Sequence, residues 1–230
     1  AILLCPPDTA RAELRAPASS APAQIAAKYA ARFEHPFRRI NALMNSSSQI
    51  PRKIPAPFDP ARAERTLMAL AEGDGGFVPS SAETEILTGA FGNSPFLARL
   101  ALRDRAFLRR TLGQPPEEVL KSIEAEVRSV AASGDINTAM QILRRAKREA
   151  ALTIALADIS GDWGLQAVTH ALSAFADACI GASVQFLLRQ TAEQAGIDAS
   201  DPAKLEAETG LIVLAMGKYG AFELNYSSDV

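Results

Sequence analysis

The sequence has few of the features that would place it in a specialised class of protein. It contains only two cysteines, Cys5 and Cys179, which are too few for a disulfide framework and have no metal-site spacing. Its 24 basic and 26 acidic residues give a net charge of −2, so no basic surface indicates nucleic-acid binding. No run of about 18 consecutive apolar residues marks a membrane span. We therefore expect a cytoplasmic protein that binds neither nucleic acid nor a membrane.

What the chain does have is the composition of a globular protein. Of its 230 residues, 48% are hydrophobic and 22% are charged, which is enough apolar material for a core. Prolines and alanines dominate residues 1–57, which we expect to form an extended lead. Residues 58–134 are predicted to form a helical module, and residues 135–230 two long helices followed by the start of a further domain. The chain begins without Met and stops at Val230 within a patterned segment, so we expect a fragment.

Capping signals predict most of the helices. Asp59-Pro60, Ser80 or Ser81, and Ser94-Pro95 each precede an apolar stripe, and the last of them is predicted to open one helix that carries Phe96 to Leu108. Pro115-Pro116 and Asp135 are predicted to start two more, the second of which reaches about Ile159 and is followed by a long helix to about Gln194. Residues expected to point inward on the long helices include Met140, Leu143, Ala146, Ala150, Ile154, Val168, Leu172, Phe175, Ala176, Cys179, Ser183, Phe186 and Leu187.

The pattern changes near the end of the chain. Leu211 to Met216 is a continuous apolar run rich in branched residues, which predicts a buried strand. A turn punctuated by glycine follows at 217–220, and residues 225–230 are predicted to start a second strand. The fold class is therefore expected to be mainly α, α+β overall, ending on a first strand-turn-strand unit.

The chemistry is concentrated in this last segment. A strand that ends at Gly217-Lys218 exposes backbone N–H groups and an ammonium that suit a phosphate, and Asp229 is a candidate metal ligand. A Walker loop is excluded, because no Ser or Thr follows Lys218. The string resembles the signature Gly-Lys-x-Gly-x-x-Glu-Leu-Asn-x-x-Ser-Asp-x-Asp of bifunctional glutamine synthetase adenylyltransferase/adenylyl-removing enzymes. The matching residues are Gly217, Lys218, Gly220, Glu223, Leu224, Asn225, Ser228 and Asp229.

The uridylyltransferases of the P-II signalling protein are the nearest competing family. Their turn carries a second Gly where this chain has Lys218, and a Pro follows their Glu-Leu where this chain has Asn225, so the adenylyltransferase family fits better. The resemblance covers roughly residues 59–230. About two hundred mostly helical residues precede the motif, which within that family is typical of the N-terminal, adenylyl-removing half.

The resemblance implies a polymerase-β-like nucleotidyltransferase that uses Mg²⁺. Asp229 would be the catalytic metal ligand, Gly217, Lys218 and Ser228 would bind nucleotide or phosphate, and Gly220, Glu223 and Asn225 would support the loop. It also implies adenylylated glutamine synthetase as substrate, P-II and its uridylylated form as regulators, and ATP, ADP and phosphate as small ligands. The family's next carboxylate would follow Val230, so the isolated chain is expected to be inactive.

Several other residues have simpler interpretations. The basic run of Arg144, Arg145, Lys147 and Arg148 is either a solvated helix face or a contact to phosphate or an acidic partner. His170 is expected to be a satisfied helix histidine and Trp163 a packing anchor. A non-catalytic helical interaction module, or a regulatory half with a decayed site, is the alternative function; the intact turn and carboxylate argue against decay.

Overall fold

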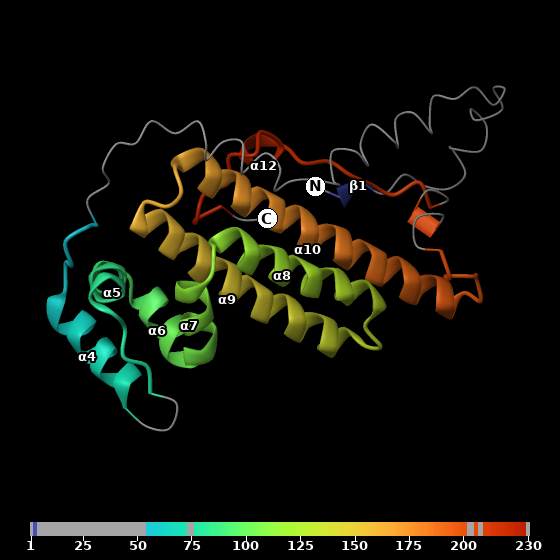
Figure 1. Ribbon diagram of the computed structural model, residues 1–230. Helices are drawn as coiled ribbons and strands as arrows, with labels where there is room; N and C mark the ends of the chain where they lie inside the picture. Colours follow the sequence, from blue (N-terminus) through green and yellow to red (C-terminus); the bar gives the residue numbers. More distant parts are fainter. Residues whose placement is uncertain (1, 4–53, 73–75, 202–204, 207–208, 229–230) are drawn as a thin grey trace.

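The computed structural model describes residues 2–3, 54–72, 76–201, 205–206 and 209–228, which are mainly helical, as predicted (Figure 1). Most of the predicted lead, 1–57, and Asp229 itself lie outside these residues. The elements are β1 (Ile2–Leu3), α4 (Pro60–Ala71), α5 (Ser81–Asn93), α6 (Pro95–Arg103), α7 (Arg105–Gly113), α8 (Pro116–Arg128), the 3-10 helix η1 (Ser129–Ala132), α9 (Ile136–Ser160), α10 (Leu165–Gln194), β2 (Ile212–Val213) and the single-turn α12 (Gly217–Gly220). The division into domains stays a prediction.

The predicted helix starts are confirmed where a polar cap precedes the stripe. The Asp59 carboxylate accepts a hydrogen bond from the Arg62 backbone N–H at 2.9 Å, at the start of α4. Ser80 and Glu83 form a reciprocal capping box at α5, which satisfies two of the amide groups left open at a helix N-terminus. The Asp135 carboxylate accepts hydrogen bonds from the Asn137 and Thr138 backbone N–H groups and so caps α9.

The single helix predicted from Phe96 to Leu108 is wrong. The chain breaks at Asp104, whose carboxylate accepts the Phe107 N–H at 2.8 Å and thereby starts α7 as a separate helix. Leu97, Leu100 and Leu108 are buried as expected, whereas Phe96 is 48% exposed. An aspartate between two arginines carries no glycine or proline signal, so only its capping geometry marks the break.

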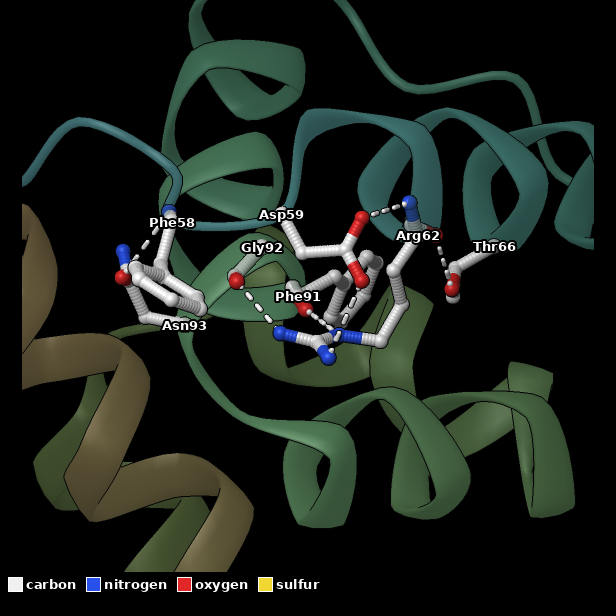
Figure 2. Close-up of polar contacts among 7 residues, drawn as sticks. All are labelled: Phe58, Asp59, Arg62, Thr66, Phe91, Gly92 and Asn93. Atoms are coloured by element: carbon white, nitrogen blue, oxygen red, sulfur yellow. Dashed lines mark hydrogen bonds and ion pairs between the residues drawn. The ribbon is translucent and has the colours of Figure 1, made fainter.

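Arg62 joins α4 to the C-terminal end of α5 (Figure 2). Its guanidinium pairs with Asp59 at 3.2 Å and donates to the backbone carbonyls of Phe91, at 2.9 Å, and Gly92. These carbonyls belong to the last turn of α5, where the backbone C=O groups find no hydrogen-bond donors within their own helix. A Cβ at Gly92 would lie 2.2 Å from the Pro57 Cβ, so the close approach requires glycine. The contacts of Arg62 thereby hold α4 against α5, and α4–α7 lie together at one end of the described residues (Figure 1).

Helix α8 and the long helices α9 and α10 lie side by side and form most of the remaining described residues (Figure 1). Trp163, in the turn between α9 and α10, is fully buried, and its indole N–H donates to the Glu117 carboxylate of α8 at 2.8 Å. This confirms Trp163 as a packing anchor. Two residues expected to point inward do not: Met140 is 37% exposed and Leu187 is 53% exposed. Each directly follows a buried residue, Ala139 and Phe186, both 3% exposed, so the neighbouring elements cover only part of the apolar stripe.

One helix of the described residues, α10, is long and apolar enough to cross a membrane by length and composition alone. A core helix passes the same test. The inner face of α10 packs against α8, η1 and α9, and Asp177 on the same helix accepts a hydrogen bond from a tyrosine side chain of a later segment. These contacts are those of a helix in a folded body.

The predicted buried strand over Leu211 to Met216 is also wrong. Only Ile212–Val213 has strand structure, and it pairs antiparallel with Ile2–Leu3, while Ile212, Leu214 and Met216 are 63%, 61% and 73% exposed. A central strand is buried by neighbours on both edges and both faces. Here the described residues supply one two-residue partner, so the run remains at the surface.

Candidate functional site

Residues 217–228, which carry the predicted site, lie along the N-terminal half of α10 (Figure 1). The predicted turn at 217–220 folds as the single-turn helix α12. Gly217 has φ of 56°, in the left-handed region, where glycine is favoured. A Cβ at Gly220 would lie 2.5 Å from the Ala215 carbonyl oxygen, so this position also requires glycine. Lys218 is exposed between them.

Two hydrogen bonds among the described residues join the segment to α10. The Tyr219 hydroxyl donates to the Asp177 carboxylate, and the Leu224 backbone N–H donates to the Ser173 hydroxyl at 3.3 Å. The Leu224 side chain is only 4% exposed. Tyr219 and Asp177 are 42 residues apart in the sequence, so no periodic pattern could have paired them.

Phe222 has a strained backbone within the same segment. Its φ is 60°, a conformation that costs a bulky residue about 1–3 kcal/mol. The ring stacks on His170 of α10, with centroids 5.1 Å apart and an interplanar angle of 26°. His170 is 9% exposed and packs against Phe222, while its hydrogen bonding stays a prediction. Phe222, which the sequence analysis did not select, helps to dock the motif.

The predicted second strand is wrong over 225–228, which form a turn. The Asn225 carboxamide oxygen accepts hydrogen bonds from the Ser227 N–H and from the Ser227 and Ser228 hydroxyls, at 3.2, 3.1 and 2.8 Å. Asn and Ser favour such local bonds over a sheet ladder. The Tyr226 hydroxyl donates to Asp158 of α9 at 3.3 Å. The turn thus brings the segment before Asp229 to the end of α9.

No group of three His, Cys, Asp or Glu side chains that could hold a metal occurs among the described residues. Glu223 is exposed, and its backbone N–H donates to the Lys218 carbonyl at 2.7 Å, which closes the loop. The candidate metal ligand Asp229 lies outside the described residues. Magnesium binding at this chain therefore stays a prediction.

Comparison with known proteins settles the family. A family model described as glutamate–ammonia ligase adenylyltransferase matches residues 84–230, which is more than half of the chain. The chain belongs to this family. It is 40% identical to the bifunctional glutamine synthetase adenylyltransferase/adenylyl-removing enzyme of Caulobacter vibrioides over 75% of the chain and 18% of that protein. The proteins of the same name from Rhodopseudomonas palustris and Bradyrhizobium diazoefficiens are 46% and 41% identical, over 60% and 76% of the chain and 14% and 17% of their own lengths.

The chain thus spans less than a fifth of these adenylyltransferase relatives. No solved structure matches it. The resemblance noted in the sequence is confirmed, and so is the mainly helical fold.

The basic run on α9 is divided between two sides. Lys147 lowers the pKa of the Cys179 thiol on α10, the helix that carries the motif, whereas Arg145 and Arg148 face α6, α7 and α8. Arg145 pairs with Glu126 of α8, and Arg145 and Arg148 line a hollow of about 100 Å³ against α6 and α7. Ten residues separate Arg148 from Asp158, which is about 15 Å along a helix. The geometry therefore favours a role for these arginines in helix packing.

A buried carboxyl lies on α8 close to Asp177. Glu124 is 4% exposed, and burial raises its pKa from 4.5 to about 7; Arg128 lowers the pKa and Asp177 raises it. Burial prevails because the Arg128 guanidinium, 3.7 Å away, is itself 64% exposed and screened by water. Burial also raises the pKa of the nearby Cys179 thiol to about 12, so this cysteine is unreactive and behaves as the small packing residue expected.

Glu124 should make the stability of the chain depend on pH. Between pH 4.5 and about 7 the folded state holds the Glu124 proton while the unfolded state loses it, so the free energy of unfolding falls as pH rises. We expect Glu124→Gln to match the parent near pH 4.5 and to exceed it by up to about 3 kcal/mol at pH 8. Urea unfolding of both proteins at the two pH values measures this. A constant difference would contradict the assignment; Glu118→Gln, at the surface end of the same helix, is the control.

Proposed function

We propose that this chain supplies part of a nucleotidyltransferase site that removes AMP from a tyrosine of glutamine synthetase. The proposal rests on family membership and on one observation about the motif. The glycine-flanked turn holds Lys218 exposed on a segment docked to α10. A lysine presented in this way is suited to a phosphate oxygen, because its ammonium is a compact charge with three donors. A helical interaction module would not need Gly217, Lys218 and Gly220 in this turn. Their presence therefore favours an enzyme over such a module.

Each motif residue has a proposed role. Lys218 binds an oxygen of the attacking phosphate or of the AMP group, and Gly217 allows the backbone to approach it. Ser228, whose hydroxyl is tied to Asn225, orients the turn that leads to Asp229. Asp229 is proposed as a ligand of Mg²⁺, which when bound would reduce the negative charge on the phosphate oxygens. Gly220, Glu223 and Asn225 maintain the loop.

The reaction proposed is phosphorolysis. An oxygen of inorganic phosphate attacks the phosphorus of tyrosine-bound AMP. The new P–O bond joins the phosphate to AMP, the bond between phosphorus and the tyrosine oxygen breaks, and the tyrosine takes up a proton. The products are ADP and unmodified glutamine synthetase. Lys218 assists by holding the two negatively charged groups together, which is the main task in phosphoryl and nucleotidyl transfer.

We propose further that the chain works in the cytoplasm within a full-length enzyme of the size of its relatives, here called the full-length enzyme. Its fold around the motif is proposed to be polymerase-β-like. Another part of the enzyme would add AMP from ATP, and P-II and its uridylylated form would regulate the two activities. The 230-residue chain alone is expected to release no ADP, since Asp229 is a single carboxylate and this chemistry uses several.

The experiment is an assay of ADP release. The full-length enzyme is incubated with adenylylated glutamine synthetase and Mg²⁺, with and without inorganic phosphate. We expect ADP only with phosphate, and Lys218→Ala should raise the KM for phosphate by about tenfold or more. Lys121→Ala, an exposed lysine on α8, is the matched control. Release of free AMP, or ADP formation that does not depend on phosphate, would refute the proposal.

A further inference from the structure

We propose that Tyr219 and Asp177 are positioning residues for phosphate binding: their hydrogen bond fixes the rotation of the α12 turn on α10 and so the direction of Lys218. This inference rests on the proposed function and adds residues that the motif does not include. Asp177 lies on α10, outside the motif, and the structure brings it to the residue that directly follows Lys218.

The geometry of a single helical turn makes this contact decisive. Successive residues on a helix are about 100° apart, so fixing the Tyr219 ring against α10 leaves Lys218 directed to a neighbouring side. Lys218 is exposed, whereas Tyr219 is half-buried. A four-residue helix has no stability of its own, because forming the first turn fixes several residues for one hydrogen bond. The orientation of α12 must therefore come from its contacts with the body.

Two other contacts between the segment and α10 lie later in the chain. Phe222 stacks on His170, and the Leu224 N–H bonds to Ser173, both beyond the turn. Tyr219 lies within the turn, next to the lysine. Loss of its hydroxyl would leave the segment docked through Phe222 and Leu224 but would free the rotation of the turn. A local loss of order with the overall fold retained is therefore expected.

The electrostatics keep the pair in its bonding state at neutral pH. Burial and the hydrogen bond to Asp177 raise the pKa of the Tyr219 hydroxyl, so it remains a neutral donor. Glu124 on α8, Asp177 and Cys179 on α10, and Lys147 on α9 are the titratable groups that influence one another here. Protonated Glu124, favoured below about pH 7, places no second negative charge beside Asp177.

The test uses variants that differ in whether they preserve the hydrogen bond. Tyr219→Phe removes the donor but keeps the ring, and Asp177→Leu removes the acceptor. Asp177→Asn keeps an acceptor oxygen and should therefore preserve the hydrogen bond and the position of Lys218. Tyr226→Phe is the matched control, because it removes another tyrosine–aspartate hydrogen bond, that of Tyr226 to Asp158 at the far end of the motif.

Two readouts are needed. In the 230-residue chain, amide hydrogen exchange at 217–220 should become faster by at least about tenfold in Tyr219→Phe and Asp177→Leu, with a melting temperature close to that of the parent. In the full-length enzyme, the same variants should raise the KM for phosphate about tenfold and change kcat much less. Asp177→Asn and Tyr226→Phe should leave this KM within about twofold, and the double variant Tyr219→Phe/Asp177→Leu should be no worse than either single one.

The outcomes separate this inference from the proposed function. Unchanged exchange in Tyr219→Phe overturns the inference whatever the enzyme does, and faster exchange with an unchanged KM shows that the bond does not position Lys218, which also overturns it. A fall in kcat as large as the rise in KM in all variants, with lower melting temperatures, would show that the bond is purely structural. That result would also overturn the inference. Absence of phosphate-dependent ADP release by the parent enzyme refutes the proposed function and, with it, the phosphate role given to Tyr219 and Asp177.

Discussion

Asp229→Asn in the full-length enzyme should lower phosphate-dependent ADP release by about 100-fold or more. The physical reason is that asparagine keeps the size of the side chain but removes the negative charge that a metal ligand contributes. Several kcal/mol of transition-state stabilisation are at stake, whereas we expect the fold to gain little from this one carboxylate. The melting temperature should therefore remain close to that of the parent.

The control for this prediction is Asp162→Asn, which changes an exposed aspartate in the turn between α9 and α10. It should leave ADP release unchanged. Addition of AMP by the full-length enzyme should also survive Asp229→Asn, because that activity is assigned to another part of the protein. Normal ADP release by Asp229→Asn would remove this residue from the site.

Trp163→Ala should lower the free energy of unfolding by about 3–5 kcal/mol. The indole is fully buried where the turn between α9 and α10 meets the first turn of α8, so its loss leaves a cavity, and the Glu117 carboxylate loses its donor. The same turn lies five residues after Asp158, the acceptor of Tyr226. Damage here should therefore also loosen the docked motif.

Denaturant unfolding followed by far-ultraviolet circular dichroism measures this effect, since Trp163 is the only tryptophan and its fluorescence is lost in the variant. Leu165→Ala, two residues later and 73% exposed, is the control and should change stability by less than about 0.5 kcal/mol. Similar losses for the two variants would contradict the role of Trp163 as an anchor.

The helices could be predicted because their signals are local. A cap such as Asp59 or Asp135 acts on amides two or three residues away, and an apolar stripe repeats every three or four residues. The sequence did not reveal the break at Asp104. This aspartate caps a helix as Asp59 and Asp135 do, but no glycine or proline lies beside it to mark the boundary. The predicted burial of Met140 and Leu187 is wrong for a different reason: a stripe shows which side of a helix is apolar, but not how much of that side its neighbours cover.

The motif could be located from the sequence, but its setting could not. A strand depends on the strands that pair with it. Among the described residues, the apolar run at 211–216 pairs only with Ile2–Leu3. A run of branched side chains does not reveal how many partners a strand will have. The bonds that dock the motif join residues more than forty positions apart, as with Tyr219 and Asp177. Acidic residues at half-buried positions of an alanine-rich helix, such as Asp177, are the signal that could have suggested a receiving surface.

The most direct test of the account follows inorganic phosphate labelled with ³²P through the reaction of the full-length enzyme with adenylylated glutamine synthetase. Attack by phosphate on tyrosine-bound AMP places the label in the β-phosphate of ADP, at one labelled phosphate per AMP removed, and Lys218→Ala should slow this incorporation at low phosphate concentration. Unlabelled AMP as the product, or ADP without label, would show that phosphate is not the attacking group and would contradict the site proposed for this chain.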